Sequence, residues 1–238
     1  LNNTTQAQIL DGAHVTTPGN VSITALDDSS VTADSAGLAV SLGIGVGASL
    51  ALNSLTDTVT AGIEGATVTT PTGHVEITAV NQPVVSALAL GGAGAGFIAA
   101  VGTITTNETH NTTEAVIGGG AFVDSAGLIT IRAEDTSGLS ADSGNMSAAG
   151  FADVGLSFAS SQAINDVNAV IRGAETEVHT DGLLDIDADS SPSLFAVGIA
   201  FTVSGALAAN GAVTVVESGG TADAGIQGGT VTASAIPI

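Results

Sequence analysis

The chain has 238 residues, enough for one or two ordinary domains, with 23 acidic residues against two basic ones, Arg132 and Arg172. Its formal charge of -21 argues against binding to nucleic acid and anionic membranes, which repel it. Six Phe and no Trp, Tyr or Cys exclude an aromatic core, disulfides and thiolate metal sites. Stability must therefore come from small aliphatic contacts and backbone hydrogen bonds in a regular stack.

The sequence repeats itself about every 54 residues, and this repeat organises the chain. A Gly-x-h-x-Ile-x-Ala motif begins at Gly19, Gly73, Gly127 and Gly182, at spacings of 54, 54 and 55 residues. A second marker, Ile or Leu before Gly-Ala or Gly-Gly, precedes it in each copy. We expect one continuous segment with repeats at approximately 1–51, 52–106, 107–164 and 165–218, and a partial repeat at 219–238.

Each repeat contains three predicted elements in the same order. The first is a Thr/Val strand through the Gly-Ala marker, ended by a turn such as residues 17–19. The second is a short alternating strand, in which Val75, Ile77 and Ala79 share one face. The third is a long uncharged run, first met at Leu38–Leu52.

The run Leu38–Leu52 alternates large aliphatic residues with Gly, Ala and Ser, which predicts a strand. We expect the large face to pack in the solenoid core and the small face to pack against another sheet, either in the same protein or in a neighbouring filament. Stacked at about 4.8 Å, four such runs would present roughly 950 Å² of uncharged surface, more than soluble monomers usually expose. The predicted assembly residues are Gly43, Gly45, Gly47, Ser49, Gly94, Gly96, Gly198 and Ala200.

Strands, turns and repeats without a helical period predict an all-β fold, a parallel β-solenoid of about four and a half repeats. The rung size stays open, because 54 residues can form one wide rung or about three rungs of 18. The run Val84–Ile104 is long enough to cross a bilayer as a helix. Its period of two, its glycines and the scarcity of basic residues argue otherwise, so no membrane insertion is expected.

The pattern that carries a family resemblance runs through Asn53, Thr56, Ile63, Gly65 and Val68, then Gly73–Ala79 and the apolar run Leu88–Ile104. It resembles the repeats of giant bacterial surface proteins, of the leukotoxin-type filamentous adhesin class and, more loosely, the filamentous haemagglutinin class. The resemblance covers essentially the whole chain and implies a secreted, elongated β-solenoid at the cell surface. The strongly acidic balance departs from the family pattern.

A catalytic constellation is not apparent in the sequence. The four histidines, His14, His74, His110 and His179, fall at different repeat offsets, and none has Ser or Asp at a motif spacing. The glycine-rich residues 91–96 are not followed by a helix start or a lysine, as a phosphate loop requires. We therefore expect no enzyme activity and no cofactor.

Two sets of polar residues recur in patterns that suggest specific roles. Asp185, Asp187 and Asp189 lie on one face of a predicted strand, where they form a solvated acidic face or a weak Ca²⁺ site. Asn53, Asn107 and Asn165 recur near the end of the long run, and we expect their side chains to stack as a hydrogen-bonded ladder.

These features predict a non-enzymatic structural segment of an extracellular filament or giant surface protein. Copies would self-associate end to end or laterally, through stacked rungs and the uncharged faces. One alternative is the stalk of an adhesin, whose contact with a host or neighbouring cell lies outside these residues. A second is a carbohydrate-active β-helix, which the lack of Trp and Tyr disfavours.

Overall fold

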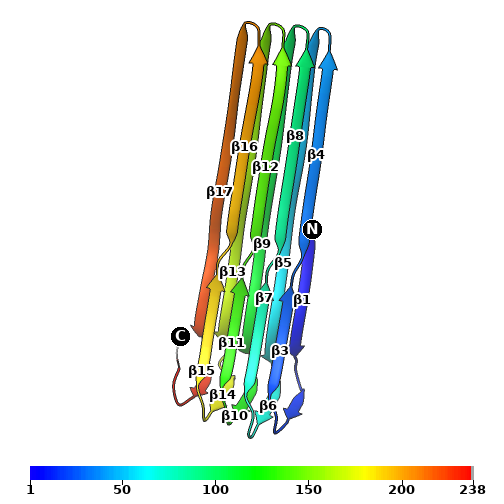
Figure 1. Cartoon of the computed structure of the whole chain (residues 1–238). Coiled ribbons are helices and arrows are strands. Elements are labelled where there is room, and N and C mark those ends of the chain that lie inside the picture. Colours follow the sequence, from blue (N-terminus) through cyan, green and yellow to red (C-terminus); the bar gives the residue numbers. More distant parts are fainter. Residues whose placement is uncertain (237–238) are drawn as a thin grey trace.

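The structure is a computed structural model that describes residues 1–236, and within them every regular element is a β-strand (Figure 1). All strand pairs are parallel and form four sheets. The back sheet contains β1 (Asn2–Ile9), β5 (Ile44–Glu64), β9 (Ile98–Gly118), β13 (Ala152–Ile171) and β17 (Leu207–Ile226). The upper front sheet contains β4 (Ser30–Ser41), β8 (Val84–Ala95), β12 (Gly138–Ala149) and β16 (Ser193–Ser204).

The two remaining sheets close the lower half. The lower front sheet contains β3 (Val21–Asp27), β7 (Val75–Asn81), β11 (Ile129–Asp135) and β15 (Leu184–Ser190). The base sheet contains β2 (His14–Thr16), β6 (Thr67–Thr70), β10 (Phe122–Ser125), β14 (Glu177–Thr180) and β18 (Thr230–Thr232). No helix in the described part of the chain is long and apolar enough to cross a membrane.

One turn of the solenoid takes 54 or 55 residues, because Ile44 of β5 aligns with Ile98 of β9 and Ala152 of β13 aligns with Leu207 of β17. Each rung runs down a back strand, crosses the base strand, climbs the lower and upper front strands, and returns through a two-residue turn at the tip (Figure 1). The predicted all-β parallel solenoid is therefore confirmed, and the rung is the wide one.

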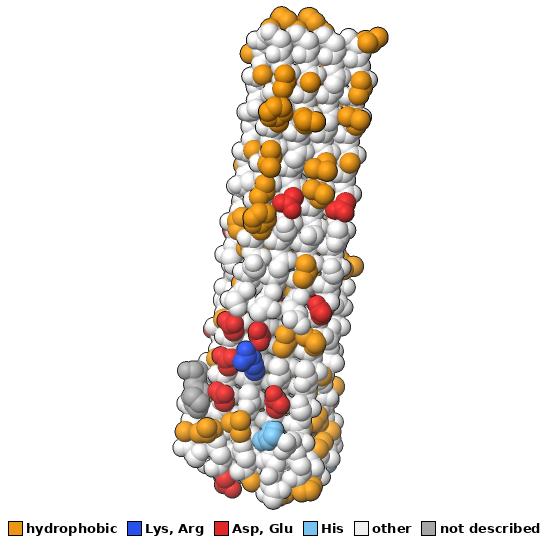
Figure 2. Space-filling view, viewed as in Figure 1, with side chains coloured by type: hydrophobic (Ala, Val, Ile, Leu, Met, Phe, Trp, Pro, Cys, Tyr) orange, Lys and Arg blue, Asp and Glu red, His pale blue; other side chains and the backbone are white. Residues whose placement is uncertain are grey.

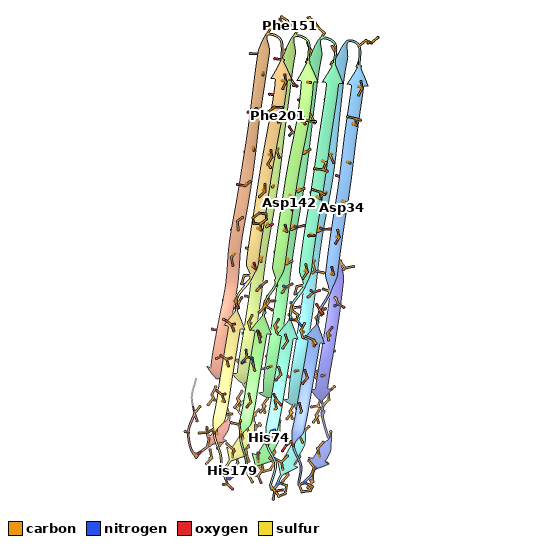
Figure 3. All side chains as sticks on the ribbon, in the orientation of Figure 1. Asp34, His74, Asp142, Phe151, His179 and Phe201 are labelled. Carbon is orange, nitrogen blue, oxygen red and sulfur yellow. The ribbon has the colours of Figure 1, made fainter. Side chains whose placement is uncertain are left out.

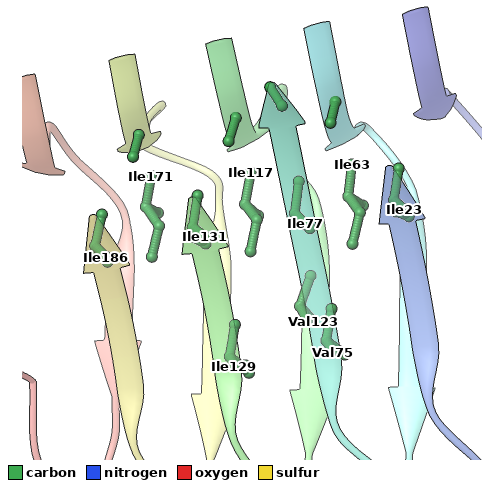
Figure 4. Packing of buried hydrophobic residues seen from close by; sticks show 14 of the residues in the cluster. Ile23, Ile63, Val75, Ile77, Ile117, Val123, Ile129, Ile131, Ile171 and Ile186 are labelled. Atoms are coloured by element: carbon green, nitrogen blue, oxygen red, sulfur yellow. The ribbon is translucent and has the colours of Figure 1, made fainter. Parts of the chain in front are cut away.

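The lower half has an ordinary apolar core, built from ladders of identical residues (Figure 4). Ile63, Ile117 and Ile171 stack in the back sheet and are fully buried. The motif isoleucines stack opposite them, including Ile77 and Ile131. Since burying such a side chain is worth about 1.5–3 kcal/mol, each added rung extends the core that stabilises its neighbours.

The distal half is built the other way round. We define it as residues 30–53, 84–107, 138–161 and 193–216, the upper front strands with the parts of the back strands that face them. There Gly45 and Gly47 are buried between the two layers, whereas Leu38 is 81% exposed and Leu42 is 98% exposed. The expectation that the large face lies in the core is wrong, whereas the small face does pack against another sheet of the same protein. The run Leu38–Leu52 is two strands joined by a turn at residues 42–43.

Close contact between the layers explains this reversal. A Cβ atom on Gly37 would lie 2.1 Å from the carbonyl oxygen of Ala48, and one on Gly47 would lie 2.3 Å from that of Gly92. Only small side chains fit such a gap. Hydroxyl groups bond across it: Ser35 and Ser49 lie 2.6 Å apart between their oxygens, and Ser143 Oγ donates to Thr103 Oγ1 at 2.8 Å.

Candidate interaction surface and buried polar seam

The outer side of the back sheet in the distal half, here called the back face, is almost entirely apolar. Its side chains form five rows that run across β5, β9, β13 and β17. Only Thr106 and Ser160, in the lowest row, carry polar side chains. From the tip downward, the rows begin at Ile44, Val46, Ala48, Leu50 and Leu52.

A groove of about 790 Å³ lies on the back face, where two neighbouring rows differ in size. One row contains the small residues Ala48, Gly102 and Gly211, with Leu156 as its single large member. The next row, here called the ridge, contains only large residues: Leu50, Ile104, Phe158 and Val213. The row of small residues, here called the small row, and the ridge therefore form a groove and a protrusion that a partner surface can complement.

The front face of the distal half is apolar as well, but it is interrupted (Figure 2). Asp34 and Asp142 stand in one outer row, and the uncovered apolar side chains above them include Met146 and Phe201 (Figure 3). At the tip, the rings of Phe97 and Phe151 stack with centroids 5.1 Å apart.

Charge is segregated along the rung. Of the chain's 25 charged residues, the distal half contains only Asp34, Asp142 and Asp153. The first two form the row described above, and Asp153 is buried, where Ser147 Oγ donates to it at 2.6 Å. Both arginines lie in the lower half, where Arg132 pairs with Glu134 and Arg172 pairs with Glu64. The molecule thus has an acidic lower half and a largely apolar distal half with only three charged residues, here called the apolar slab.

The residues predicted as an assembly surface are not brought together on one face. Gly45, Gly47 and Ser49 are buried between the layers, and Gly198 and Ala200 belong to inward-facing rows. Gly43 and Gly96 lie at the tip turns, and Gly94 lies in an outer row beside Val40. The error is physical: hydrophobicity alone assigned the large side chains to the core, but the spacing of the layers admits only small ones.

The asparagine ladder is confirmed for one pair. Asn53 Nδ2 donates to Asn107 Oδ1 at 3.0 Å, and Asn107 Nδ2 donates to the carbonyl of Ser140 at 2.5 Å. Asn165 is not in this row, because the register places it beside Asn111, four residues further along the strand.

That second row belongs to a buried polar seam at the junction of the front sheets, which the sequence reading missed. Asp57, Asn111 and Asn165 stack in the back sheet, opposite Asn81 and Asp135 of the lower front sheet. All five are at most 3% exposed. The signal was present, since Asn3, Asp57, Asn111 and Asn165 recur at intervals of 54 residues.

The two fully buried carboxylates of the seam differ in their partners. Asp135 accepts hydrogen bonds from Asn81 at 2.9 Å, from Asn111 at 3.1 Å, from Asn165 at 2.6 Å and from Ser137. Burial raises its pKa, and the donors from Ser137, Asn111 and Asn81 lower it.

Asp57 is poorly satisfied by comparison. It accepts one long hydrogen bond, from Ser29 at 3.4 Å, and its Oδ1 is buried without a partner among the described residues. Burial raises the pKa of Asp57 to about 6, and the nearby carboxylate of Asp27 adds to the rise. The seam therefore contains one carboxylate that is well hydrogen-bonded, Asp135, and one that is destabilised when charged, Asp57.

The acidic row Asp185, Asp187 and Asp189 lies on the outer side of β15. Arg132 Nη1 is 3.4 Å from Asp187 Oδ2, and Ser191 Oγ donates to Asp189 at 2.9 Å. Within residues 1–236 no group of three or more His, Cys, Asp or Glu side chains is arranged to hold a metal ion. Calcium binding at these residues stays a prediction.

The fold and surface define the chain as a wide-rung parallel β-solenoid with an apolar distal slab. No protein-family model, no curated protein and no solved structure matches the chain.

Proposed function

We propose that the chain is a non-enzymatic structural segment of an extracellular filament or giant surface protein. The observation that carries this proposal is the rung itself: the strands of successive rungs pair in parallel at one register, with rows such as Ile63, Ile117 and Ile171 repeated in the core, so each rung is a template for the next. The resemblance of the repeats to filamentous adhesins supports the same role. Copies self-associate, and neither nucleic acid nor a membrane is the partner of a chain this acidic.

The apolar slab supports self-association, because a surface of this size and composition is rarely left uncovered on a soluble monomer. The predicted mode changes, however. The large outer side chains, and not the Gly/Ala/Ser faces, mediate lateral contact. In the adhesin-stalk alternative the same solenoid has the same mechanical role, and receptor binding belongs to other regions.

Electron microscopy of the purified chain at increasing concentration tests the proposal. We expect elongated assemblies with a repeat of about 4.8 Å along their axis in fibre diffraction. Antibodies against the chain should label intact cells that produce it. Monomers at every concentration, an intracellular signal, or release of sugars from a polysaccharide panel would each contradict the proposal.

A further inference from the structure

We propose that the back face binds a second copy of this solenoid in reversed orientation, so that the tip of each copy points toward the base of the other. The inference rests on the proposed structural function and names the partner and the geometry of lateral association.

Shape favours this orientation. The small row at Ala48 and Gly102 lies directly beside the ridge at Leu50 and Ile104. A two-fold axis along the solenoid, placed between these rows, sets the ridge of each copy over the small row of the other. A two-fold axis along the strands sets ridge against ridge. Only reversal sets Leu50, Ile104 and Val213 of each ridge over small residues of the other copy, with Phe158 against Leu156. This matching of one row to another within the same face is the self-complementarity that a two-fold interface requires.

The area is sufficient for a stable contact. Four strands spaced about 4.8 Å apart and ten residues of about 3.3 Å each give a flat face of roughly 630 Å² per copy. Specific interfaces bury about 600–1,000 Å² per partner. The back face, which has no charged side chain in its five rows, meets this requirement without the front face.

Charge points to the same orientation. Each copy carries a formal charge of -21, and 22 of its 25 charged residues lie outside the distal half. Reversal overlaps the two uncharged back faces and sends the acidic lower halves to opposite ends. A parallel pair would hold those halves side by side. The remaining repulsion is screened by salt, so the dimer should tighten as ionic strength rises.

Sedimentation equilibrium of the 238-residue chain and two variants tests the surface. Ile104→Glu places a charge on the ridge of the back face, at a residue that is 45% exposed. Leu90→Glu is the matched control on the front face, at a residue that is 49% exposed. We expect Ile104→Glu to weaken dimerisation at least tenfold and Leu90→Glu to leave it unchanged. Equal effects, or an unaffected dimer in Ile104→Glu, would overturn the proposal.

Spin labels test the orientation, because the chain contains no cysteine. Gly43 lies at the tip, and a Cβ there meets nothing within 4 Å. For nitroxides on Gly43→Cys, the reversed dimer predicts a separation of about 40 Å, from twelve residues of strand. A separation below about 25 Å, near the spacing of two facing sheets, shows a parallel pair and overturns the proposal.

Two further readouts separate this inference from the proposed function. Filaments that form equally well from Ile104→Glu would overturn the lateral contact and leave the structural role standing. A reversed dimer that forms no larger assembly would support the contact and count against the filament. Flotation of the chain with phosphatidylcholine vesicles, lost in Ile104→Glu, would assign the face to lipid and overturn the proposal.

Discussion

Asn53 and Asn107 occupy the same position in successive rungs, and the amide nitrogen of Asn53 donates to the amide oxygen of Asn107 at 3.0 Å. The side-chain nitrogen of Asn107 in turn donates to the carbonyl oxygens of Val85 and Ser140 in the facing sheet. One buried side chain thus connects two rungs and both layers.

Replacing Asn107 with an apolar side chain of similar size should lower the stability of the fold. We expect Asn107→Leu to lower the free energy of unfolding by about 2–4 kcal/mol, because buried polar partners lose their hydrogen bonds. Urea denaturation followed by circular dichroism measures the change. Thr106→Ala, on the adjacent outer position, should change it by less than about 0.5 kcal/mol. Similar losses in both variants would argue against the ladder.

The narrow gap between the layers predicts opposite outcomes for two glycine substitutions. Gly47→Ala places a Cβ 2.3 Å from the carbonyl oxygen of Gly92, so it should destabilise the fold by about 1–3 kcal/mol. Gly102→Ala meets nothing within 4 Å and should be neutral or slightly stabilising. Thermal unfolding of the two variants checks this. A tolerated Gly47→Ala would contradict the close approach of the layers.

The reversed distal half also makes two large aliphatic residues behave differently. Ile117 is fully buried in the lower core, and Ile117→Ala should cost about 2–5 kcal/mol. Leu38 is 81% exposed, and Leu38→Ser should cost less than about 0.5 kcal/mol. Denaturant midpoints measured at low protein concentration, where copies do not associate, provide the comparison. A large loss in Leu38→Ser would indicate that this side chain is in a core after all.

Stability should fall as pH rises through the titration of Asp57. The pKa of its carboxyl is about 6 in the folded chain, whereas an aspartate in the unfolded chain has the ordinary value of 3.8. Between these values the folded state holds the proton more tightly than the unfolded state, so this group favours folding at low pH and loses up to about 3 kcal/mol by neutral pH.

Asp57→Asn should remove that dependence and stabilise the chain at pH 7.5, since Asn already occupies the row at Asn111 and Asn165. Unfolding free energies at pH 4.5 and 7.5 test this. Asp34→Asn, an exposed change of the same charge, is the control. Equal pH profiles for Asp57→Asn and the unaltered chain would rule out the role of this carboxyl.

Much of the fold could be predicted from local periodicity. The alternation of Val75, Ile77 and Ala79, repeated at 54-residue spacing, determines the strand, the stacking partner and the buried face in the lower half. The burial of the distal half could not be predicted in this way. Its strands alternate large and small residues that are all uncharged, so the alternation does not show which of the two faces is buried. What decides there is the approach of Gly37 to Ala48, a contact between strands eleven residues apart around the tip turn.

The surface was misassigned for the same reason. Leu42-Gly43 carries no strong turn signature, so the sequence leaves open whether the run Leu38–Leu52 is one long strand or bends, and the strand reversal at the tip is not located. The buried seam was missed because Asp57 looks like a surface acid until its row mates Asn111 and Asn165 are aligned with it.

Rung length varies only at the base. Every tip turn has two residues, whereas the turn from back strand to base strand spans residues 65–66 in one rung and 172–176 in another. The base turns therefore tolerate changes in length. Peptides inserted there would extend from one end of the solenoid as a regularly spaced array, and the apolar slab would keep its dimensions.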